Sequence, residues 1–329
     1  MNERPPIIAQ PIKVFQLNVQ HKKHTTIQLL NSLHTDFDIL LLQEPAWSFI
    51  GRDQTSGRDI DGPVALKGWQ TILPVTSTDH NSPRPRTLTY YRSRTSNNFN
   101  ITLRLDLLED RDIQVLEISQ ANHPNTLVIN VYNNSPKGDL CALNKLRDVI
   151  GTFPDHPTLI TGDFNLHHPN WSREDRALEQ DQLAISTAEW LANKNFTLLN
   201  TRGEITHLAR HAGERPSVID LSFANAEASR LESFKQWAVD PNLALDSDHN
   251  AIKFTIDHGL REIPDYFPIK FNLNKVDPED WTKTLDAELI NLEPTLHPLL
   301  NNPALSNAQL DLYADSLSTV IHNTLTKTA

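Results

Sequence analysis

Apolar and polar residues alternate along short segments of the first three-quarters of the chain. Between Lys13 and Gln20, Phe15, Leu17 and Val19 fall on one face of an expected strand. The apolar run 39–42 predicts a second strand that is buried on both faces. Similar patterns predict strands at 88–91, 101–105, 113–118, 127–132, 158–161, 217–223 and 251–256.

A helical spacing of apolar residues appears between these strands. Ile27, Leu30 and Leu33 lie on adjoining turns of an expected helix at 25–35. Further helices are expected at 139–150 and 176–194. Many strands with only a few long helices between them favour an α/β (α+β) fold, in which two mixed β-sheets pack face to face with helices outside.

The pattern changes after residue 256. Pro264, Pro268 and Pro278 interrupt the chain, and residues 278–325 read as helical and acidic without a strand signal. A chain of 329 residues is long for one hydrophobic core. We therefore expect a main domain at 1–258 and a linker with a helical appendage at 259–329.

Composition narrows the possible classes of protein. The single cysteine, Cys141, excludes a disulfide framework and a cysteine-based zinc site. The longest aliphatic run, 39–42, is far shorter than the roughly 20 residues of a membrane-spanning helix, and the N-terminus shows no secretory signal. We expect an intracellular protein without a membrane partner.

The formal net charge is −11, from 30 basic and 41 acidic residues. Nucleic-acid-binding proteins are usually basic, so this value alone argues against that class. If some carboxylates hold a divalent cation, however, the local field near that site changes sign. The net charge therefore does not decide the substrate.

Polar residues follow or interrupt several of the expected strands. These are Asn18, Gln43-Glu44-Pro45, Gly162-Asp163-Phe164-Asn165, Asp220, and Ser247-Asp248-His249. Taken singly, each has a structural alternative: Glu44 as a loop acid, Asp163 and Asn165 as a turn pair, Asp220 as half of a buried ion pair. An acid beside an imidazole, as at 248–249, fixes the tautomer of the ring and favours its protonated form. Together, the five segments predict one site at the edge of a sheet.

In this order, the motifs resemble those of the endonuclease/exonuclease/phosphatase superfamily. They read Leu-Asn-Val-Gln at 17–20, Leu-Gln-Glu-Pro at 42–45, Asn-Val-Tyr at 130–132, Gly-Asp-Phe-Asn at 162–165, Ile-Asp-Leu at 219–221 and Ser-Asp-His at 247–249. Within the superfamily, the chain looks most like the apurinic-type endonuclease domains of LINE (non-LTR) retrotransposons. The longest pointer is the block Gly-Asp-Phe-Asn-Leu-His-His-Pro-Asn-Trp at 162–171. The resemblance covers roughly residues 12–257.

This resemblance implies a four-layer α/β/β/α sandwich and Mg²⁺-dependent hydrolysis of a phosphodiester, with Mn²⁺ as a possible substitute. Glu44, Asn18 and Asp248 match metal-site positions, and Asp163 and Asn165 match the residues that act on the attacking water. Tyr132 matches a tyrosine near the scissile phosphate, His249 matches the imidazole paired with Asp248, and Asp220 matches an aspartate that supports either the metal or the histidine.

Two positions depart from the family pattern. Relatives often carry an acid where this chain has Gln20, which weakens any second metal site on that side. They also often carry an asparagine three residues after the tyrosine, where this chain has Ser135. We assign the missing contact to Asn134, although its neighbour Asn133 is an alternative.

Basic residues suggest where a nucleic acid would lie. Arg84, Arg86, Arg92 and Arg94 flank two tyrosines in a segment without acids, and we predict that they bind the DNA backbone. The alternative is an edge strand with solvated arginines. Further arginines occur in the loop 202–215.

The resemblance implies an endonuclease that nicks target DNA and leaves a 3′-hydroxyl primer, acting in the nucleus. It also implies a covalent or functional association with a reverse transcriptase, toward which 259–329 would lead. The rivals are another phosphoesterase, acting on a soluble or lipid phosphoester, and a catalytically dead nucleic-acid-binding remnant. The sequence leaves the oligomeric state open.

Overall fold

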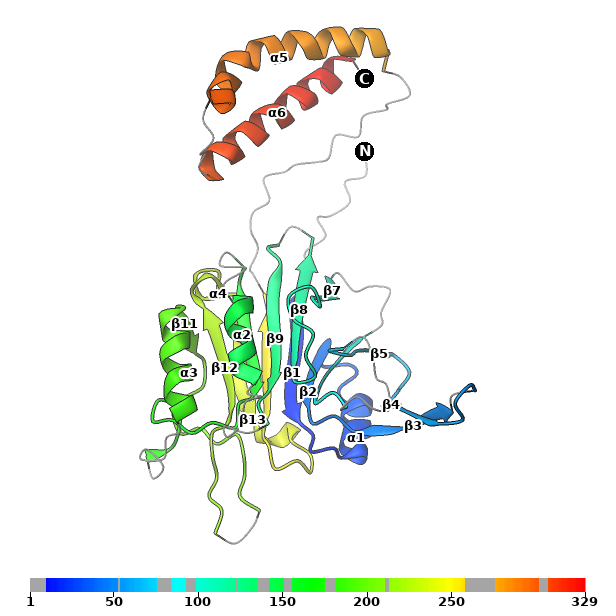
Figure 1. Cartoon of the computed structure of the whole chain (residues 1–329), viewed down its shortest axis with the longest axis vertical. Coiled ribbons are helices and arrows are strands. Elements are labelled where there is room, and N and C mark those ends of the chain that lie inside the picture. Colours follow the sequence, from blue (N-terminus) through cyan, green and yellow to red (C-terminus); the bar gives the residue numbers. More distant parts are fainter. Residues whose placement is uncertain are drawn as a thin grey trace. The chain divides into compact units, whose positions relative to one another are not determined.

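The computed structural model describes residues 10–52, 54–75, 84–92, 99–121, 123–134, 142–150, 156–174, 182–210, 213–257, 276–301 and 307–328. The chain forms two compact units, Met1–Arg261 and Glu262–Ala329. Figure 1 labels the elements of both units, and each is described by itself.

Two six-stranded mixed sheets form the centre of the first unit. The first sheet has the order β13 (Phe234–Asp240), β14 (Ala251–Ile256), β1 (Ile12–Asn18), β2 (Ile39–Gln43), β6 (Thr87–Arg92), β5 (Trp69–Ile72). The second has the order β11 (Phe196–Leu198), β12 (Asp220–Asn225), β10 (Thr158–Asp163), β9 (Thr126–Tyr132), β8 (Ile113–Gln120), β7 (Phe99–Leu103). The pairs β1–β2 and β9–β10 are parallel, and the other neighbours are antiparallel.

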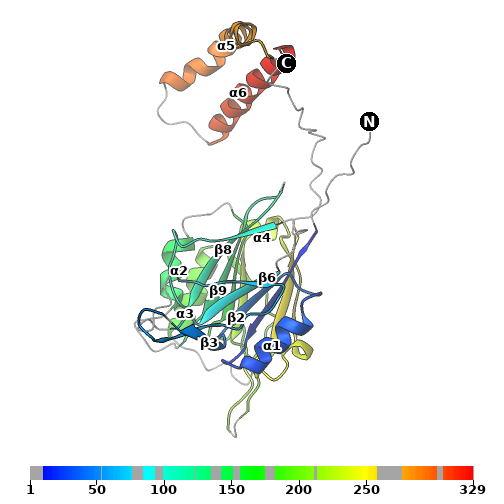
Figure 2. The same cartoon turned by 90° about the vertical axis from the view of Figure 1, so that its right-hand side faces the viewer.

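Helices cover the outer face of each sheet. Leu29, Leu30 and the nearby Leu33 of the α1 region (helix Lys23–Ser32) pack on the first sheet. Helices α2 (Ala142–Ile150) and α3 (Gln182–Asn193) pack on the second sheet. Figure 2 shows α1 on one side of the sheets and α2 and α3 on the other. The prediction of two mixed sheets with helices outside is confirmed, and the layers follow the order α/β/β/α.

Between the sheets, the side chains change from apolar to polar along each strand. The two sheets meet through residues such as Val14, Ile39, Val128 and Leu159 at one end. Two residues further along β1, Gln16 donates through Nε2 to Gln43 Oε1 over 2.6 Å, and its side chain is fully buried. Buried amides and hydroxyls therefore replace hydrocarbon toward one edge of the sandwich, where ionisable groups follow.

These buried amides continue across both sheets. Gln43 Nε2 donates to Asn130 Oδ1 over 2.6 Å, and Asn130 Nδ2 donates to Gln114 Oε1 over 3.1 Å. Buried polar groups are tolerated when they are hydrogen-bonded. The network joins β1 and β2 to β9 and β8 beneath the polar edge.

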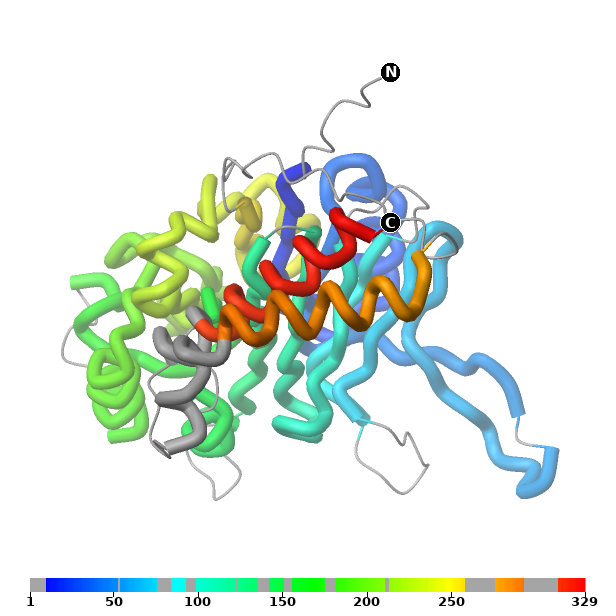
Figure 3. Tube along the Cα trace, turned by 90° about the horizontal axis from the view of Figure 1, so that it is seen from above, coloured from blue at the N-terminus to red at the C-terminus, as the bar shows by residue number. Residues whose placement is uncertain are grey.

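A smaller, two-stranded ribbon leaves the sandwich directly after β2. It consists of β3 (Trp47–Arg52) and β4 (Asp59–Pro63), with a bulge at Ile50. Figure 3 shows this ribbon projecting away from the sheets. The remaining short elements are α4 (Ala226–Arg230) and the 3₁₀ turn Pro241–Leu243.

One strand begins later than its sequence pattern predicts. The pattern 217–223 places Asp220 inside a strand, but β12 begins at Asp220. Before it, Ser217 makes an isolated bridge with His207, and Thr206 Oγ1 accepts hydrogen bonds from the N–H groups of Ile219 and Asp220. The Thr206 hydroxyl thus accepts the backbone hydrogen bonds that a neighbouring strand would otherwise accept, and Asp220 lies at the edge of the sheet.

The second unit contains α5 (Pro278–Asn301) and α6 (Asn307–Thr328), which pack against each other. This agrees with the helical pattern at 278–325. Within the described ranges, no helix combines the length and the apolar character that a membrane crossing requires.

Candidate active site

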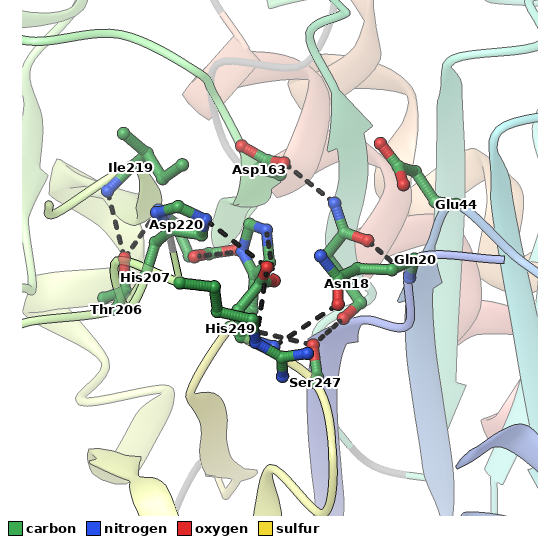
Figure 4. Close-up of polar contacts among 12 residues, drawn as sticks. Asn18, Gln20, Glu44, Asp163, Thr206, His207, Ile219, Asp220, Ser247 and His249 are labelled. Atoms are coloured by element: carbon green, nitrogen blue, oxygen red, sulfur yellow. Dashed lines mark hydrogen bonds and ion pairs between the residues drawn. The ribbon is translucent and has the colours of Figure 1, made fainter. Parts of the chain in front are cut away.

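Strand pairing brings the chemically distinctive residues to one edge of the sandwich. The register of β1 and β2 places Asn18 opposite Gln43, next to Glu44. The register of the second sheet places Asp163 between Tyr132 and Asp220. Figure 4 shows how Asn18, Glu44, Asp163, Asp220 and His249 approach one another from both sheets. Because carboxyl ends of parallel strands and amino ends of antiparallel neighbours meet at the same edge, the topology accounts for the cluster.

Asp163 lies at the centre of this cluster and is 1% exposed. Its Oδ2 accepts a hydrogen bond from Asn18 Nδ2 over 2.9 Å, and its Oδ1 accepts one from the backbone N–H of Asn165 over 3.0 Å. Burial raises the pKa of Asp163 to about 7, and the carboxylates of Asp220 and Glu44 add to the rise, whereas His249 and the Asn18 hydrogen bond oppose it. A carboxylate with a pKa near neutrality suits a group that accepts a proton from water.

A glycine fixes the position of Asp163. Gly162 has a φ of +141°, and a Cβ there would lie 2.0 Å from the carbonyl oxygen of Val131. Only glycine lets β10 pass this close to β9 in that conformation.

His249 and Asp220 form a buried pair. His249 Nδ1 lies 2.8 Å from Asp220 Oδ2, and the two side chains are 6% and 0% exposed. Burial lowers the pKa of His249, but Asp220, with help from Asp163 and Asp248, outweighs it and raises the pKa to about 9. The imidazole is therefore protonated at neutral pH, and its Nε2 remains available to donate.

Further contacts hold this histidine in place. The backbone N–H of His249 donates to Ser247 Oγ over 3.1 Å, and that hydroxyl donates to the carbonyl oxygen of Asn18 over 2.7 Å. The start of β14 is thereby tied to the end of β1. The choice that the sequence left open is resolved in geometric terms: Asp220, not its neighbour Asp248, contacts Nδ1 of His249.

Glu44 stands on the other side of Asn18. Its φ of 46° is uncommon for a residue with a side chain, and Gln20, His21 and Asn165 share such values. Strained backbone of this kind gathers at functional sites. The hydroxyl of Tyr132 donates to Glu44 Oε1, and burial followed by this contact raises the pKa of Tyr132 above its ordinary value. Tyr132 thus orients Glu44.

Asp248 lies between two histidines. Its Oδ1 is 3.8 Å from His249 Nε2, and its Oδ2 is 3.9 Å from His207 Nε2 and 3.6 Å from Arg210 Nε. Oδ1 is buried and has no hydrogen-bond partner within the described part of the chain. Asp248 reaches the other side of the site through its backbone N–H, which lies 3.4 Å from Gln20 Oε1.

The residues around Glu44 fit a hard divalent cation. The Glu44 carboxylate and the Asn18 amide supply oxygen atoms, which Mg²⁺ prefers. Asn18 Oδ1 accepts one hydrogen bond, from the backbone N–H of Gln20 over 2.9 Å, and a carbonyl oxygen has a second lone pair. Burial is the main cause of the raised pKa of Asp163, and the charge of Glu44 adds to it. A cation beside them would offset that repulsion.

Gln20, which stands where relatives often have an acid, is itself engaged. Its Oε1 accepts a hydrogen bond from Lys22 Nζ over 2.9 Å, and Lys22 also donates to the carbonyl oxygen of Asp246 over 2.8 Å. An ammonium group therefore lies beside the position of the missing acid. This arrangement favours one metal ion on the Glu44 side.

The predicted arginine group does not form one basic surface. Arg86 donates to Asp112 through two nitrogens, and its guanidinium lies 5.2 Å from the Tyr132 ring centroid. Arg86 therefore packs against a residue of the site. Arg92 is 8% exposed and pairs with Asp38 at the end of β6 remote from Glu44. Arg84 is exposed and pairs with Asp61 of the ribbon. Arg94 lies outside the described residues.

The two asparagines after Tyr132 differ in environment. Asn133 is fully buried and donates through Nδ2 to the carbonyl oxygen of Phe164 over 2.8 Å. Asn134 is exposed at the edge of the site. Its assignment as a substrate contact remains a prediction, and Ser135 lies outside the described residues.

Several residues of the site escaped the sequence analysis. Thr206 positions Asp220, Ser247 positions His249, and His207 stacks beside His249 with ring centroids 4.8 Å apart. Thr206 and His207 lie 14 and 42 residues before their partners Asp220 and His249, so no local spacing reveals them. Ser247 belongs to the Ser247-Asp248-His249 motif singled out in the sequence, but its contact with His249 was not predicted.

A cavity of about 360 Å³ lies elsewhere. Leu127 and Thr158, which line it, are at the beginnings of β9 and β10, whereas Tyr132 and Asp163 are at their ends. The cavity therefore does not belong to the site.

Comparisons with known proteins agree with this geometry. Residues 126–253 match the family model described as endonuclease-reverse transcriptase. No curated protein shows a significant match to the chain. The endonuclease domain of TRAS1, a telomere-specific non-LTR retrotransposon, is 21% identical with a TM-score of 0.56, over 75% of this chain and 98% of that domain.

Two other solved structures are more distant. A 3′-5′ exonuclease from Neisseria meningitidis is 17% identical with a TM-score of 0.48, over 75% of this chain and 100% of its own. An endonuclease/exonuclease/phosphatase family protein from Leptotrichia buccalis is 12% identical with a TM-score of 0.49, over 75% and 99%. The resemblance inferred from the motifs is confirmed: the first unit has the fold of the TRAS1 endonuclease domain, and residues 126–253 match the endonuclease-reverse transcriptase family model.

Proposed function

We propose that the protein is a Mg²⁺-dependent DNA endonuclease of the retrotransposon type, which nicks one strand and leaves a 3′-hydroxyl end. One observation supports this proposal above all: three groups converge at one edge of the sandwich. They are the oxygen ligands of Glu44 and Asn18, the buried Asp163 carboxylate with its raised pKa, and the Asp220–His249 pair. Mg²⁺, or Mn²⁺ in its place, would be held by Glu44 and Asn18 with Asp248 nearby. It would supply positive charge to a phosphodiester.

The protein residues would divide the remaining work. Asp163, held by Asn18 and Asn165, would orient a water molecule and accept its proton. His249, protonated and oriented by Asp220, would donate through Nε2 to a phosphate oxygen whose charge grows in the transition state. Positioning and electrostatic stabilisation of this kind supply most of the catalysis in phosphoryl transfer.

The two projections beside the site favour DNA over a small phosphoester. One is the ribbon β3–β4, which begins three residues after Glu44 and exposes Phe49 and Ile50, each 60% accessible. The other is the hairpin whose arms are 206–210 and 213–217, paired through His207 and Ser217. Figure 1 shows this hairpin extending beyond the ends of the sheets. Apolar side chains that enter a groove and arginines that track phosphates are common in DNA-binding proteins.

Among the described residues, the hairpin region carries three exposed arginines, whereas the segment around β6 carries one, Arg84. Arg202, Arg210 and Arg215 are exposed there, whereas Arg86 and Arg92 are committed to Asp112 and Asp38. We therefore propose that the DNA backbone is contacted mainly by the hairpin, with Arg84 and Asn134 on the opposite side. The proposed path of the DNA thus moves from the segment around β6 to the hairpin, and DNA remains the proposed partner.

Substrate comparison tests the proposal. Purified protein with Mg²⁺ would be assayed on supercoiled plasmid, on a soluble phosphomonoester and on a phospholipid dispersion. We expect conversion of plasmid to the open-circular form, abolished by EDTA, and no comparable hydrolysis of the other two. Hydrolysis of a phosphomonoester or lipid at a higher rate than DNA nicking would favour the phosphatase alternative.

DNA affinity offers an independent check of the path. Each neutralised phosphate contributes about −0.9 to the slope of log K against log salt. Replacing Arg202, Arg210 and Arg215 by alanine should make that slope shallower by about 2 to 3. Arg230→Ala is the matched control, since Arg230 is exposed and paired with Glu227 on α4, remote from the site. Equal slopes for the triple variant and the control would place the DNA elsewhere.

The division of labour between the two units is also a proposal. Every residue assigned to catalysis lies within 1–258, and we propose that 259–329 connects this domain to a reverse transcriptase. Association with such an enzyme, and action in the nucleus, follow only if the retrotransposon assignment holds.

A further inference from the structure

Three side chains on the hairpin side of the site are arranged like the ligands of a transition-metal ion. One nitrogen of His207, one of His249 and a carboxylate oxygen of Asp248 lie within 4.8 Å of one another. Asp248 directs one oxygen to each ring, with Oδ1 3.8 Å from His249 Nε2 and Oδ2 3.9 Å from His207 Nε2. Two imidazole nitrogens and one carboxylate oxygen form a common zinc ligand set.

The surroundings of the two rings are those of metal-binding histidines. His249 Nδ1 is bound to Asp220 at 2.8 Å, which leaves Nε2 as the outward atom. His207 Nδ1 lies 3.3 Å from Ser217 Oγ, which likewise leaves its Nε2 directed toward Asp248. A histidine ligand typically has its other nitrogen hydrogen-bonded to a carboxylate or other polar group, and that contact sets the tautomer and ring orientation.

A second observation points to a ligand at this position. Asp248 is 8% exposed, and its Oδ1 has no hydrogen-bond partner within the described residues. An unpaired buried carboxylate oxygen is costly, and a metal ion would satisfy it. The ligand atoms lie up to 4.8 Å apart, which exceeds the roughly 3.3 Å between ligands of a tetrahedral zinc ion, so binding requires the side chains to approach one another by up to about 1.5 Å.

We propose that His207, Asp248 and His249 form a binding site for Zn²⁺, separate from the Glu44–Asn18 site, and that zinc bound there inhibits the enzyme. Mg²⁺ prefers oxygen ligands and would not compete well for two imidazoles. Zinc bound to Nε2 of His249 would release to solvent the proton that this nitrogen carries at neutral pH, so the ring could no longer donate to the phosphate. The inhibitory part rests on the proposed function, whereas metal binding does not.

One group opposes the ion. The Arg210 Nε atom lies 3.6 Å from Asp248 Oδ2, and Arg210 also contacts the carbonyl oxygen of Asp246. Its positive charge competes with a metal for the carboxylate. Arg210→Gln should therefore bind zinc more tightly than the unaltered protein, an effect that a merely structural role for these residues would not produce.

Cobalt binding provides a test that needs no catalysis. The full chain would be titrated with Co²⁺, whose visible absorption reports nitrogen and oxygen ligands, and Zn²⁺ would then be added as competitor. We expect one Co²⁺ per chain, displaced by Zn²⁺, with affinity at least about tenfold weaker in His207→Ala and in Asp248→Asn. His34→Ala is the matched control, because His34 precedes β2 at the end remote from Glu44, and its ring lies 2.6 Å from the carbonyl oxygen of Asn31.

Two further variants separate this site from the proposed magnesium site. Glu44→Gln should bind Co²⁺ as the unaltered protein does, and His207→Ala should lose Zn²⁺ inhibition of nicking. Equal Co²⁺ affinity in His207→Ala and His34→Ala, or loss of Co²⁺ binding in Glu44→Gln, would overturn the proposal. If nicking fails altogether while Co²⁺ binding follows the expected pattern, the proposed function is wrong and the zinc site stands.

Discussion

The Asp220–His249 pair yields the sharpest prediction for catalysis. Its contact distance is 2.8 Å in a buried setting, and the pKa of His249 rises from 6.5 to about 9. Since one pH unit corresponds to about 1.4 kcal/mol, the protonated ring is favoured by roughly 3 kcal/mol in the folded protein. Burial alone acts in the opposite direction, so this preference depends on Asp220 and the neighbouring carboxylates.

Asp220→Asn removes the charge while keeping the shape of the side chain. Without that carboxylate, burial still lowers the pKa of His249 and only Asp163 and Asp248 still raise it, so the pKa should fall and fewer rings should carry a proton at pH 7.5. Loss of one transition-state donor costs about 10²–10³ in turnover. We therefore expect Asp220→Asn to nick plasmid more slowly at pH 7.5, by up to about 10²–10³-fold where no protonated ring remains, while Asp248→Asn loses less.

The pH dependence and a double-mutant cycle test the cause. The ratio of the Asp220→Asn rate to the unaltered rate should rise as the pH is lowered from 8 to 6, because the variant's ring regains its proton while the unaltered ring is protonated throughout. His249→Ala combined with Asp220→Asn should be no slower than His249→Ala alone. A ratio that does not change with pH, or single effects that multiply in the double variant, would refute the claim that Asp220 acts through His249. Thermal unfolding of each variant serves as the control for folding.

Four other predictions follow from the same geometry. Glu44→Gln should raise the Mg²⁺ concentration for half-maximal nicking and lower the rate, since a neutral amide binds a hard cation poorly; a Mg²⁺ titration measures both. Asp163→Asn should reduce single-turnover cleavage by about 10² or more with little change in DNA affinity, and parallel loss of affinity would contradict its role. Without a metal ion, the pKa of Asp163 is about 7 and that of His249 about 9. Activity should therefore fall at lower pH, where Asp163 gains a proton, and at higher pH, where His249 loses one. A pH–rate series should also show that added Mg²⁺ shifts the fall on the acidic side to lower pH. Gln43→Leu should lower the free energy of unfolding by about 2 kcal/mol in urea titrations, because it leaves buried partners on two sides of the amide network unpaired.

The strands that carry the site were predictable because both of their faces are buried. Ile39–Leu42 and the alternation around Leu17 reflect packing on helix and sheet, and Glu44 and Asp163 stand out because they follow such runs. The ribbon β3–β4 escaped prediction because its residues are largely exposed and show no regular alternation. The alternation of apolar and polar residues arises where one face of a strand is buried, so an exposed ribbon shows no such alternation.

Long-range pairing was the part that sequence reasoning could not reach. The sequence predicts a DNA contact for Arg92, but this residue pairs with Asp38, which lies 54 positions earlier in the chain. The choice between Asp220 and Asp248 as the partner of His249 likewise depended on how the two sheets pack, because His249 precedes β14 of the first sheet and Asp220 begins β12 of the second. Local spacing identified the residue types, and sheet topology assigned their partners.

The ends of the cleaved DNA test the central claim most directly. Supercoiled plasmid would be nicked with Mg²⁺ by the unaltered protein and by Glu44→Gln, and the nicked product would be given to a DNA polymerase with labelled nucleotides. The account predicts that the unaltered protein yields open circles that the polymerase extends without prior phosphatase treatment, because the 3′ end is a free hydroxyl, and that Glu44→Gln yields few. Nicks that the polymerase cannot extend, or equal nicking by Glu44→Gln, would contradict it.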